Sequence, residues 1–144
     1  MQAVRIKKLD HVNIHTANVA RLVDWYERVL GMPAGDRPAF PFPGAWLYCG
    51  NDAAVHLIGV EKQPEHPATL QLEHFAFTAV GLKDFLARLE RERVPYYVRR
   101  MPGGGTVLIN IHDPDGNHIH VDFSGPETEG VELRGVAPSA MGTR

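Results

Sequence analysis

Two stretches of the chain begin alike, and this likeness constrains the fold more than any other feature. LDHVNIHTA starts at Leu9 and LEHFAFTAV starts at Leu72, and each opens with an apolar residue, an acidic residue and a histidine. The residues that follow alternate between apolar and other types, which is typical of a half-buried strand. A strand opening that occurs twice predicts a duplicated module.

A segment with helical periodicity follows each of these strands. In the first, apolar residues recur at spacings of three and four over 19–29, and Gly31 with Pro33 should stop the helix. In the second, the same spacing covers 82–89, and Pro95 should end the helix. We therefore expect one helix in each module.

Short strand-like runs follow both helices. They cover 45–50 and 53–60 in the first half, and 96–100, 106–112 and 118–123 in the second. The stretch DRPAFPFPGAW is too rich in proline for a central strand, which leaves the second strand of the first module poorly defined. The shared order is strand, helix, then two or three strands.

This order predicts an α+β fold in which two tandem βαβββ modules form an open, half-barrel sheet with the helices on the outside. The first module covers about 6–62 and the second about 70–124, which together make one domain over 1–124. Residues 125–144 lack periodicity and are expected to be a C-terminal tail that is loose or lies on a neighbour. The open faces of the two sheets would enclose a trough.

Histidines gather on the strand faces expected to line this trough. The apolar set of each strand should pack against a helix, so the alternate residues point the other way. The histidines of that second set are His11, His15, His56, His74, His112, His118 and His120. His66 falls in a loop and is assigned to the surface. A single histidine on a strand is usually a hydrogen-bonded or half-exposed residue, but a set at matching positions calls for another explanation.

Four of these histidines occupy positions related by the repeat. His56 follows His11 by 45 residues and His120 follows His74 by 46. Imidazole is a common ligand of divalent transition metals. We predict that these four hold one divalent ion of Zn, Ni, Fe, Mn or Co. The remaining trough histidines, His15, His112 and His118, are interpreted as partners of the ligands, substrate contacts or rim residues.

Composition excludes several classes of function. A formal charge of −2 gives no electrostatic case for binding nucleic acid or an anionic membrane. No apolar run reaches the 18 or so residues that span a bilayer, and the N-terminus lacks the apolar core of a secretory signal. Cys49 is the single cysteine, so an intrachain disulfide is excluded. These features predict a cytoplasmic protein.

The segments that carry these patterns resemble the vicinal-oxygen-chelate superfamily, which includes glyoxalase I, bleomycin resistance proteins and extradiol dioxygenases. The resemblance covers roughly 6–124, in the pieces LDHVNIHTANVARLVDWYERVLGM, GAWLYCG with AVHLI, LEHFAF and NIHDPDGNHIHV. Carried over by position, the family's ligands fall on His11, His56, His74 and His120. Metal-dependent members generally place Glu at the last site, and glyoxalase I often has Glu or Gln at the second. Histidine at both is a departure that puts the glyoxalase I reaction itself in doubt.

The resemblance implies a small-molecule substrate, a metal that chelates two substrate oxygens, and a homodimer. We expect a lyase or isomerase acting on an α-oxygenated carbonyl compound, with His120, His118 or His15 moving the proton. The alternatives are an extradiol-type dioxygenase that uses Fe(II) and a non-catalytic binding or resistance protein. Residues expected to contact the substrate are Asn13, Arg37, Tyr48, Arg99 and Asn110.

Overall fold

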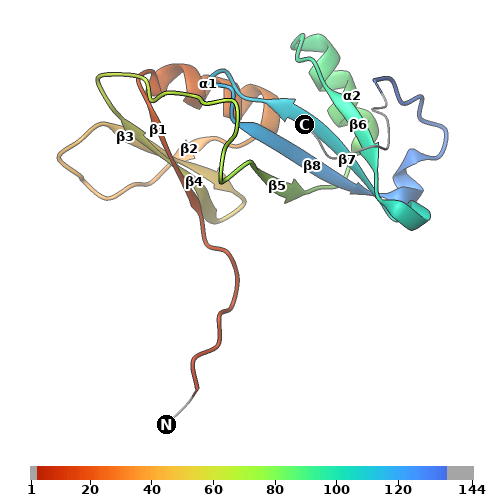
Figure 1. Ribbon diagram of the computed structural model, residues 1–144, viewed down its shortest axis with the longest axis horizontal. Coiled ribbons are helices and arrows are strands. Elements are labelled where there is room, and N and C mark those ends of the chain that lie inside the picture. Colours follow the sequence, from red (N-terminus) through yellow and green to blue (C-terminus); the bar gives the residue numbers. More distant parts are fainter. Residues whose placement is uncertain (1–2, 136–144) are drawn as a thin grey trace. The chain divides into compact units, whose positions relative to one another are not determined.

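The computed structural model describes residues 3–135, and the chain divides into two compact units between Glu65 and His66. Within 3–135, each unit contains one α-helix and one four-stranded sheet, and the ribbon shows the helices and strands of both units (Figure 1). The order of elements is βαβββ in both units, and both sheets are mixed and open. The predicted pair of tandem βαβββ modules is therefore confirmed.

The first unit is built on a sheet with strand order β1-β4-β3-β2. Its elements are β1 (Val12–Thr16), α1 (Val19–Leu30), β2 (Ala34–Gly35), β3 (Gly44–Cys49) and β4 (Asp52–Gly59). Strand β1 is parallel to β4, and the other pairs are antiparallel. His11 lies just before β1 rather than within it, because the strand begins at Val12. The poorly defined second strand is the two-residue β2, and the proline-rich stretch after it is a loop.

Helix α1 has clear local signals at both ends. The Asn18 side chain accepts a hydrogen bond from the backbone N–H of Arg21, which satisfies a donor that the first turn leaves unpaired. Gly31 closes the helix at φ 67°, a left-handed conformation that favours glycine. The buried side chains between these ends are Leu22, Trp25, Tyr26 and Val29. Together with buried Leu47, Val55 and Leu57 of β3 and β4, they form the core of the unit.

The second unit repeats this plan with strand order β5-β8-β7-β6. Its elements are β5 (His74–Thr78), α2 (Leu82–Arg91), β6 (Tyr97–Arg100), β7 (Thr106–His112) and β8 (His118–Ser124). Short 3₁₀ turns cover Pro102–Gly104 and Gly125–Thr128. In the parallel pair of β5 and β8, His74 lies opposite His118 and Ala76 lies opposite His120. These histidines consequently share one face of the sheet.

Helix α2 ends at Arg91, four residues before the proline expected to stop it. Arg93 adopts a left-handed conformation at φ 57° and donates its N–H to the carbonyl of Glu90. The N–H of Val94 donates to the carbonyl of Leu89. These two bonds satisfy the last carbonyls of the helix in a Schellman motif, with arginine where glycine is usual. The prediction that Pro95 ends the helix was wrong because this motif ends it first.

The core of the second unit lies between α2 and the apolar face of its sheet. The buried residues of α2 are Leu82, Phe85, Leu86 and Leu89, and the Phe85 ring lies 5.6 Å from that of Phe123 on β8. Fully burying each large apolar side chain contributes about 1.5–3 kcal/mol. The alternation of apolar and polar residues predicted for β7 and β8 is observed, with Val107, Ile109, Ile111, Ile119, Val121 and Phe123 all buried.

Residues 125–135 belong to the second unit and contact its helix α2 and strand β6. Glu127 accepts hydrogen bonds through Oε1 from the backbone N–H groups of Gly81 and Leu82, at the start of α2. The N–H of Val98 on β6 donates to the carbonyl of Gly135. The rest of the predicted tail, 136–144, lies outside the described residues. Neither of the two helices within 3–135 is long and apolar enough to cross a membrane.

Candidate functional site

A carboxylate orients a histidine at the start of the first strand of each unit. His11 donates from Nδ1 to Asp10 Oδ2 at 2.7 Å, and His74 donates from Nδ1 to Glu73 Oε1 at 2.7 Å. A proton held on Nδ1 leaves the lone pair on Nε2, the tautomer that binds a metal through Nε2. The acidic residue before each histidine was visible in the repeat, but the sequence did not assign it a role.

The second predicted ligand of each unit lies at an equivalent place on the sheet. His56 on β4 is opposite Asn13 of β1, and His120 on β8 is opposite Ala76 of β5. Both histidines are buried. His120 donates from Nδ1 to Asp122 Oδ1 at 2.5 Å, so it too keeps Nε2 for another partner. The structure thus gives three of the four predicted ligands a carboxylate partner on Nδ1.

His56 has a different environment. Its ring is stacked between those of His11, at a centroid distance of 3.8 Å, and Trp46, at 4.1 Å. Its Nε2 lies 3.0 Å from the carbonyl oxygen of Ala53, which accepts from it in the tautomer protonated there. Burial and, to a smaller extent, the charge of His11 lower the pKa of His56. The neutral ring that results is the form that binds a metal.

His118 lies beside the two predicted ligands of the second unit, with its ring centroid 5.1 Å from that of His74 and 6.3 Å from that of His120. Its Nδ1 donates to Glu73 Oε2 at 2.7 Å, and its Nε2 lies 2.8 Å from the side-chain oxygen of Asn110. The His112 ring is stacked on it at 5.1 Å. Burial lowers the pKa of His118, whereas its hydrogen bond to Glu73 opposes that shift. Hydrogen bonds from His74 and then His118 lower the pKa of Glu73 to about 2, so Glu73 is ionised.

Glu73, His74 and His118 form a compact group whose potential ligand atoms lie within 4.8 Å of one another. The His120 ring adjoins it, with its centroid 4.6 Å from that of His74. Imidazole and carboxylate are donors that suit divalent transition metals, so the chemistry of these residues fits a metal ion. The second unit therefore brings His74, His118 and His120 together, and the first unit brings His11 to His56.

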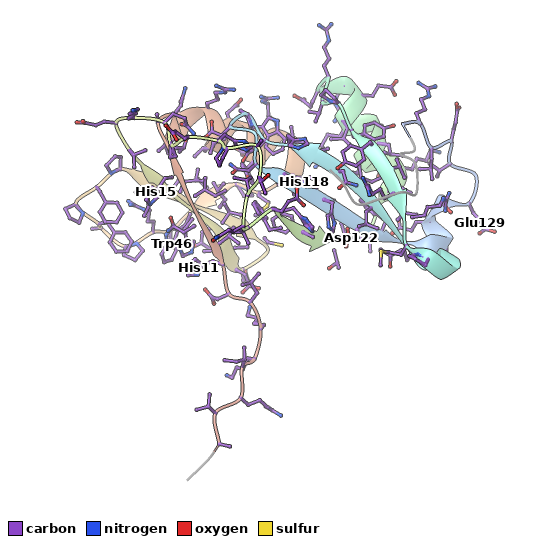
Figure 2. All side chains as sticks on the ribbon, viewed as in Figure 1. His11, His15, Trp46, His118, Asp122 and Glu129 are labelled. Carbon is purple, nitrogen blue, oxygen red and sulfur yellow. The ribbon has the colours of Figure 1, made fainter. Side chains whose placement is uncertain are left out.

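The other predicted site residues have varied surroundings. Asn13 and His15 are exposed on β1, and Asn110 is buried on β7. Tyr48 donates its hydroxyl to the backbone oxygen of Asp36 at 2.5 Å. The guanidinium of Arg99 lies over the Tyr97 ring, and that of Arg37 lies beside Phe40 and Phe42 in the proline-rich loop. Figure 2 labels His11, His15 and Trp46 in the first unit and His118 and Asp122 in the second.

His66 lies in a surface loop, as predicted, and contacts the turn that precedes β8. His66 is exposed, and its Nε2 contacts the carbonyl oxygen of Gly116 at 3.0 Å. Residues 113–116 form a tight turn in which Gly116 has φ 91°. Asp113 organises this turn, since its Oδ1 accepts hydrogen bonds from the backbone N–H groups of Asp115 and Asn117. The turn sets where β8 begins, and hence where His118 and His120 lie.

Comparison with known proteins places these features in a family. The model of the Glyoxalase/Bleomycin resistance protein/Dioxygenase superfamily matches residues 8–121. The chain belongs to this superfamily. A relative in this superfamily, Glyoxylase I 4 of Arabidopsis thaliana, is 28% identical over 125 residues, which cover 82% of this chain and 71% of that protein. The resemblance predicted from the sequence is therefore confirmed.

Solved structures share the superfamily fold. A protein from Bacillus anthracis described as of the glyoxalase family superimposes with a TM-score of 0.71 at 21% identity, covering 85% of this chain and 99% of that one. Lactoylglutathione lyase from Agrobacterium tumefaciens superimposes with a TM-score of 0.60 at 19% identity, covering 81% and 92%. At these identities the likeness shows the fold alone. Members of the superfamily generally use a divalent metal and bind small molecules.

Proposed function

We propose that the chain is a metal-dependent glyoxalase-like enzyme, a lyase or isomerase that chelates an α-oxygenated carbonyl substrate on a divalent metal ion. The observation that supports this most strongly is the repeated carboxylate–histidine pair. Asp10 with His11, and Glu73 with His74, are matched in sequence position and in hydrogen-bond length. In each module the carboxylate holds the proton on Nδ1 and leaves the Nε2 lone pair free. A metal shared by the two modules would require this arrangement in both.

The proposed ligands are His11, His56, His74 and His120. The proposal needs the two pairs to meet, either within one chain or across a homodimer. A cation bound by neutral imidazoles keeps its full charge and acts as a Lewis acid toward substrate oxygens. The metal would be Zn, Ni, Fe, Mn or Co.

His118 is the strongest candidate for moving a proton, ahead of His15 and His120. The Glu73 carboxylate fixes its ring, while burial favours its neutral form. Its other nitrogen faces Asn110 on β7. A ring held by a carboxylate on one side can accept a proton at the other nitrogen and release it again. Asn13, Asn110, Arg37, Arg99 and Tyr48 are proposed as substrate contacts.

A second candidate function is an Fe(II)-dependent dioxygenase. Glu73, His74 and His118 together supply two imidazoles and one carboxylate, the donor set of many non-haem Fe(II) oxygenases. In this alternative Glu73 is itself a ligand, and all three ligands come from the second unit. The two candidates therefore differ in which residues hold the metal.

Metal analysis of the protein as purified, combined with alanine variants, tests the proposal. We expect a bound divalent metal in the wild type, its loss in His74→Ala, and its retention in the surface control His66→Ala. His56→Ala should lose the metal and His118→Ala should keep it, whereas the dioxygenase alternative predicts the reverse. A bound metal at a hundred times its Kd would stabilise the fold by about 2.7 kcal/mol, so chelation should lower the Tm.

A non-catalytic binding protein gives a different result. In that case the protein contains no metal, the addition of each candidate metal leaves the Tm unchanged, and His74→Ala binds small molecules as the wild type does. That set of results would overturn the proposal.

A further inference from the structure

The loop between β2 and β3 in the first unit is held firmly in place. Residues 36–43 contain Pro38, Pro41 and Pro43, which restrict the backbone. The N–H of Phe40 donates to the carbonyl of Pro38 at 2.8 Å, and the N–H of Gly59 on β4 donates to that of Pro43 at 2.8 Å. A loop restrained at its middle and at its end presents its side chains in a fixed arrangement.

Two phenylalanine side chains of this loop are partly exposed to solvent. Phe40 and Phe42 are 41% and 38% exposed, and their rings are stacked with centroids 5.0 Å apart and planes 17° apart. Large aromatic side chains are normally buried, and clustered exposed ones mark binding sites. We call Phe40, Phe42 and Trp46 the aromatic platform, because the Phe40 ring also lies 6.4 Å from that of Trp46.

A positive charge lies beside the platform. The guanidinium carbon of Arg37 is 5.0 Å from the centroid of the Phe40 ring and 5.2 Å from that of Phe42. Its Nη2 donates to the carbonyl of Phe42 at 3.0 Å. Among the described residues, none accepts a hydrogen bond from its buried Nε. This cation matches a ligand with a negative charge.

The platform is continuous with two of the proposed metal ligands in the same unit. The Trp46 ring stacks on that of His56 at 4.1 Å and 13°, and the His56 ring stacks on that of His11 at 3.8 Å and 10°. The stacked rings of Trp46, His56 and His11, together with the tilted contact between Phe40 and Trp46, thus connect the exposed loop to these imidazoles. The platform therefore adjoins these imidazoles, and the substituent of a ligand chelated by a metal at His11 and His56 is within reach of it.

We infer that the substrate is an aromatic, anionic α-oxygenated carbonyl compound whose ring lies on the aromatic platform and whose charge is matched by Arg37. This inference rests on the proposed function, because it assigns the oxygens of the same molecule to the proposed metal. It distinguishes this chain from an enzyme for small aliphatic carbonyl compounds, whose substrates would not contact Phe40 and Phe42. Aromatic contacts prefer offset stacking, which exposed and parallel rings offer.

Two probes with the same charge and the same vicinal oxygens test the inference. Phenylglyoxylate carries a phenyl ring where pyruvate carries a methyl group. We expect calorimetric titration of the metal-loaded protein to show phenylglyoxylate binding about tenfold more tightly or better, the factor that about 1.4 kcal/mol of stacking represents. Phe40→Ala/Phe42→Ala and Trp46→Leu should each reduce this preference to about twofold. Val80→Ala, which removes an exposed apolar side chain of the second unit, should leave it unchanged.

Fluorescence provides an independent signal. The chain has two tryptophans, so Trp25→Phe leaves Trp46 as the single tryptophan emitter. Phenylglyoxylate should quench that emission at concentrations that match its calorimetric Kd, and pyruvate should do so only at about tenfold higher ones. Arg37→Gln should weaken both ligands by a similar factor, because both are anions.

The same titrations after chelation separate this inference from the proposed function. Metal-dependent binding of both probes with equal affinity overturns the inference and leaves the proposed function standing. A preference for phenylglyoxylate that persists without metal and disappears in Trp46→Leu supports the platform and contradicts the metal role. Absence of measurable phenylglyoxylate binding, with the fold intact by circular dichroism, overturns the inference.

Discussion

His56 lies face to face with His11, with the ring centroids 3.8 Å apart and the planes inclined by only 10°. Two rings so close cannot both be protonated without strong repulsion. Burial and the charge of His11 accordingly lower the pKa of His56. Because the neutral ring binds metals, the lowered pKa lets His56 keep its metal-binding form to a lower pH than an ordinary histidine does.

The metal-free protein should lose stability as the pH falls below 6.5. His56 and His118 both have a pKa below their ordinary value of 6.5 in the folded chain, so the unfolded chain takes up protons first. Above pH 6.5 the two histidines make their full contribution to the free energy of unfolding. This contribution is lost as the pH falls through their pKa values in the folded chain. The Tm, measured in chelator by circular dichroism, should be lower at pH 5.5 than at pH 7.5.

The variant His118→Gln tests one source of this loss of stability. It removes one of the two histidines with a lowered pKa, so the difference in Tm between pH 7.5 and pH 5.5 should become smaller. Glu73 has a pKa of about 2 in the folded chain and an ordinary value of 4.5. Its contribution to stability therefore changes mainly below pH 4.5, outside the range between pH 5.5 and pH 7.5. A Tm that is equal at the two pH values, or higher at pH 5.5, would contradict the assignment.

Asp122→Asn should weaken metal binding without unfolding the protein. Asp122 accepts a hydrogen bond from Nδ1 of His120 and thereby fixes both the ring and its tautomer. Removing such a partner typically lowers metal affinity about 10- to 100-fold. Competition with a metal-binding dye measures the change. Glu65→Gln, an exposed acid in the loop after β4, serves as a charge-matched control and should bind like the wild type.

Glu127→Ala should destabilise the second unit by about 1–2 kcal/mol. Its carboxylate accepts hydrogen bonds from the backbone N–H groups of Gly81 and Leu82, where α2 begins without a side-chain cap of its own. A negative charge at this end also interacts favourably with the helix dipole. Urea unfolding measures the free energy. The exposed neighbour Glu129→Ala should change it by less than about 0.5 kcal/mol, and equal effects would refute the capping role.

Asp113→Ala should affect both stability and the proposed site. Asp113 is 4% exposed, and its side chain accepts hydrogen bonds from the backbone N–H groups of Asp115 and Asn117 and from the Asn117 amide. Leaving such buried donors unpaired costs about 1–3 kcal/mol. The turn also sets the start of β8, so the signals of His118 and His120 in a proton–nitrogen NMR spectrum should shift. Asp115→Ala, which keeps these hydrogen bonds, should leave those signals in place.

Much of the fold could be predicted because its signals are local. The alternation in 107–111 and 119–123 identified the buried face of β7 and β8, since successive side chains of any strand point to opposite sides. The spacing in α1 and the glycine after it defined that helix at both ends. The end of α2 was missed because Arg93 takes a conformation for which arginine carries no sequence signal.

The amino-acid sequence alone determined the duplicated βαβββ plan, the family, and the strand face on which the histidines of the second unit's sheet lie, because these depend on periodicity and on residue order. Only the tertiary structure decided which groups those histidines contact. Glu73 reaches His118 across 45 residues because β5 and β8 pair in parallel, and Trp46 stacks on His56 because the antiparallel pairing of β3 and β4 places these two residues opposite each other. Hydrogen bonds and stacking between strands depend on register and rotamer, and neither is contained in a local pattern of residues.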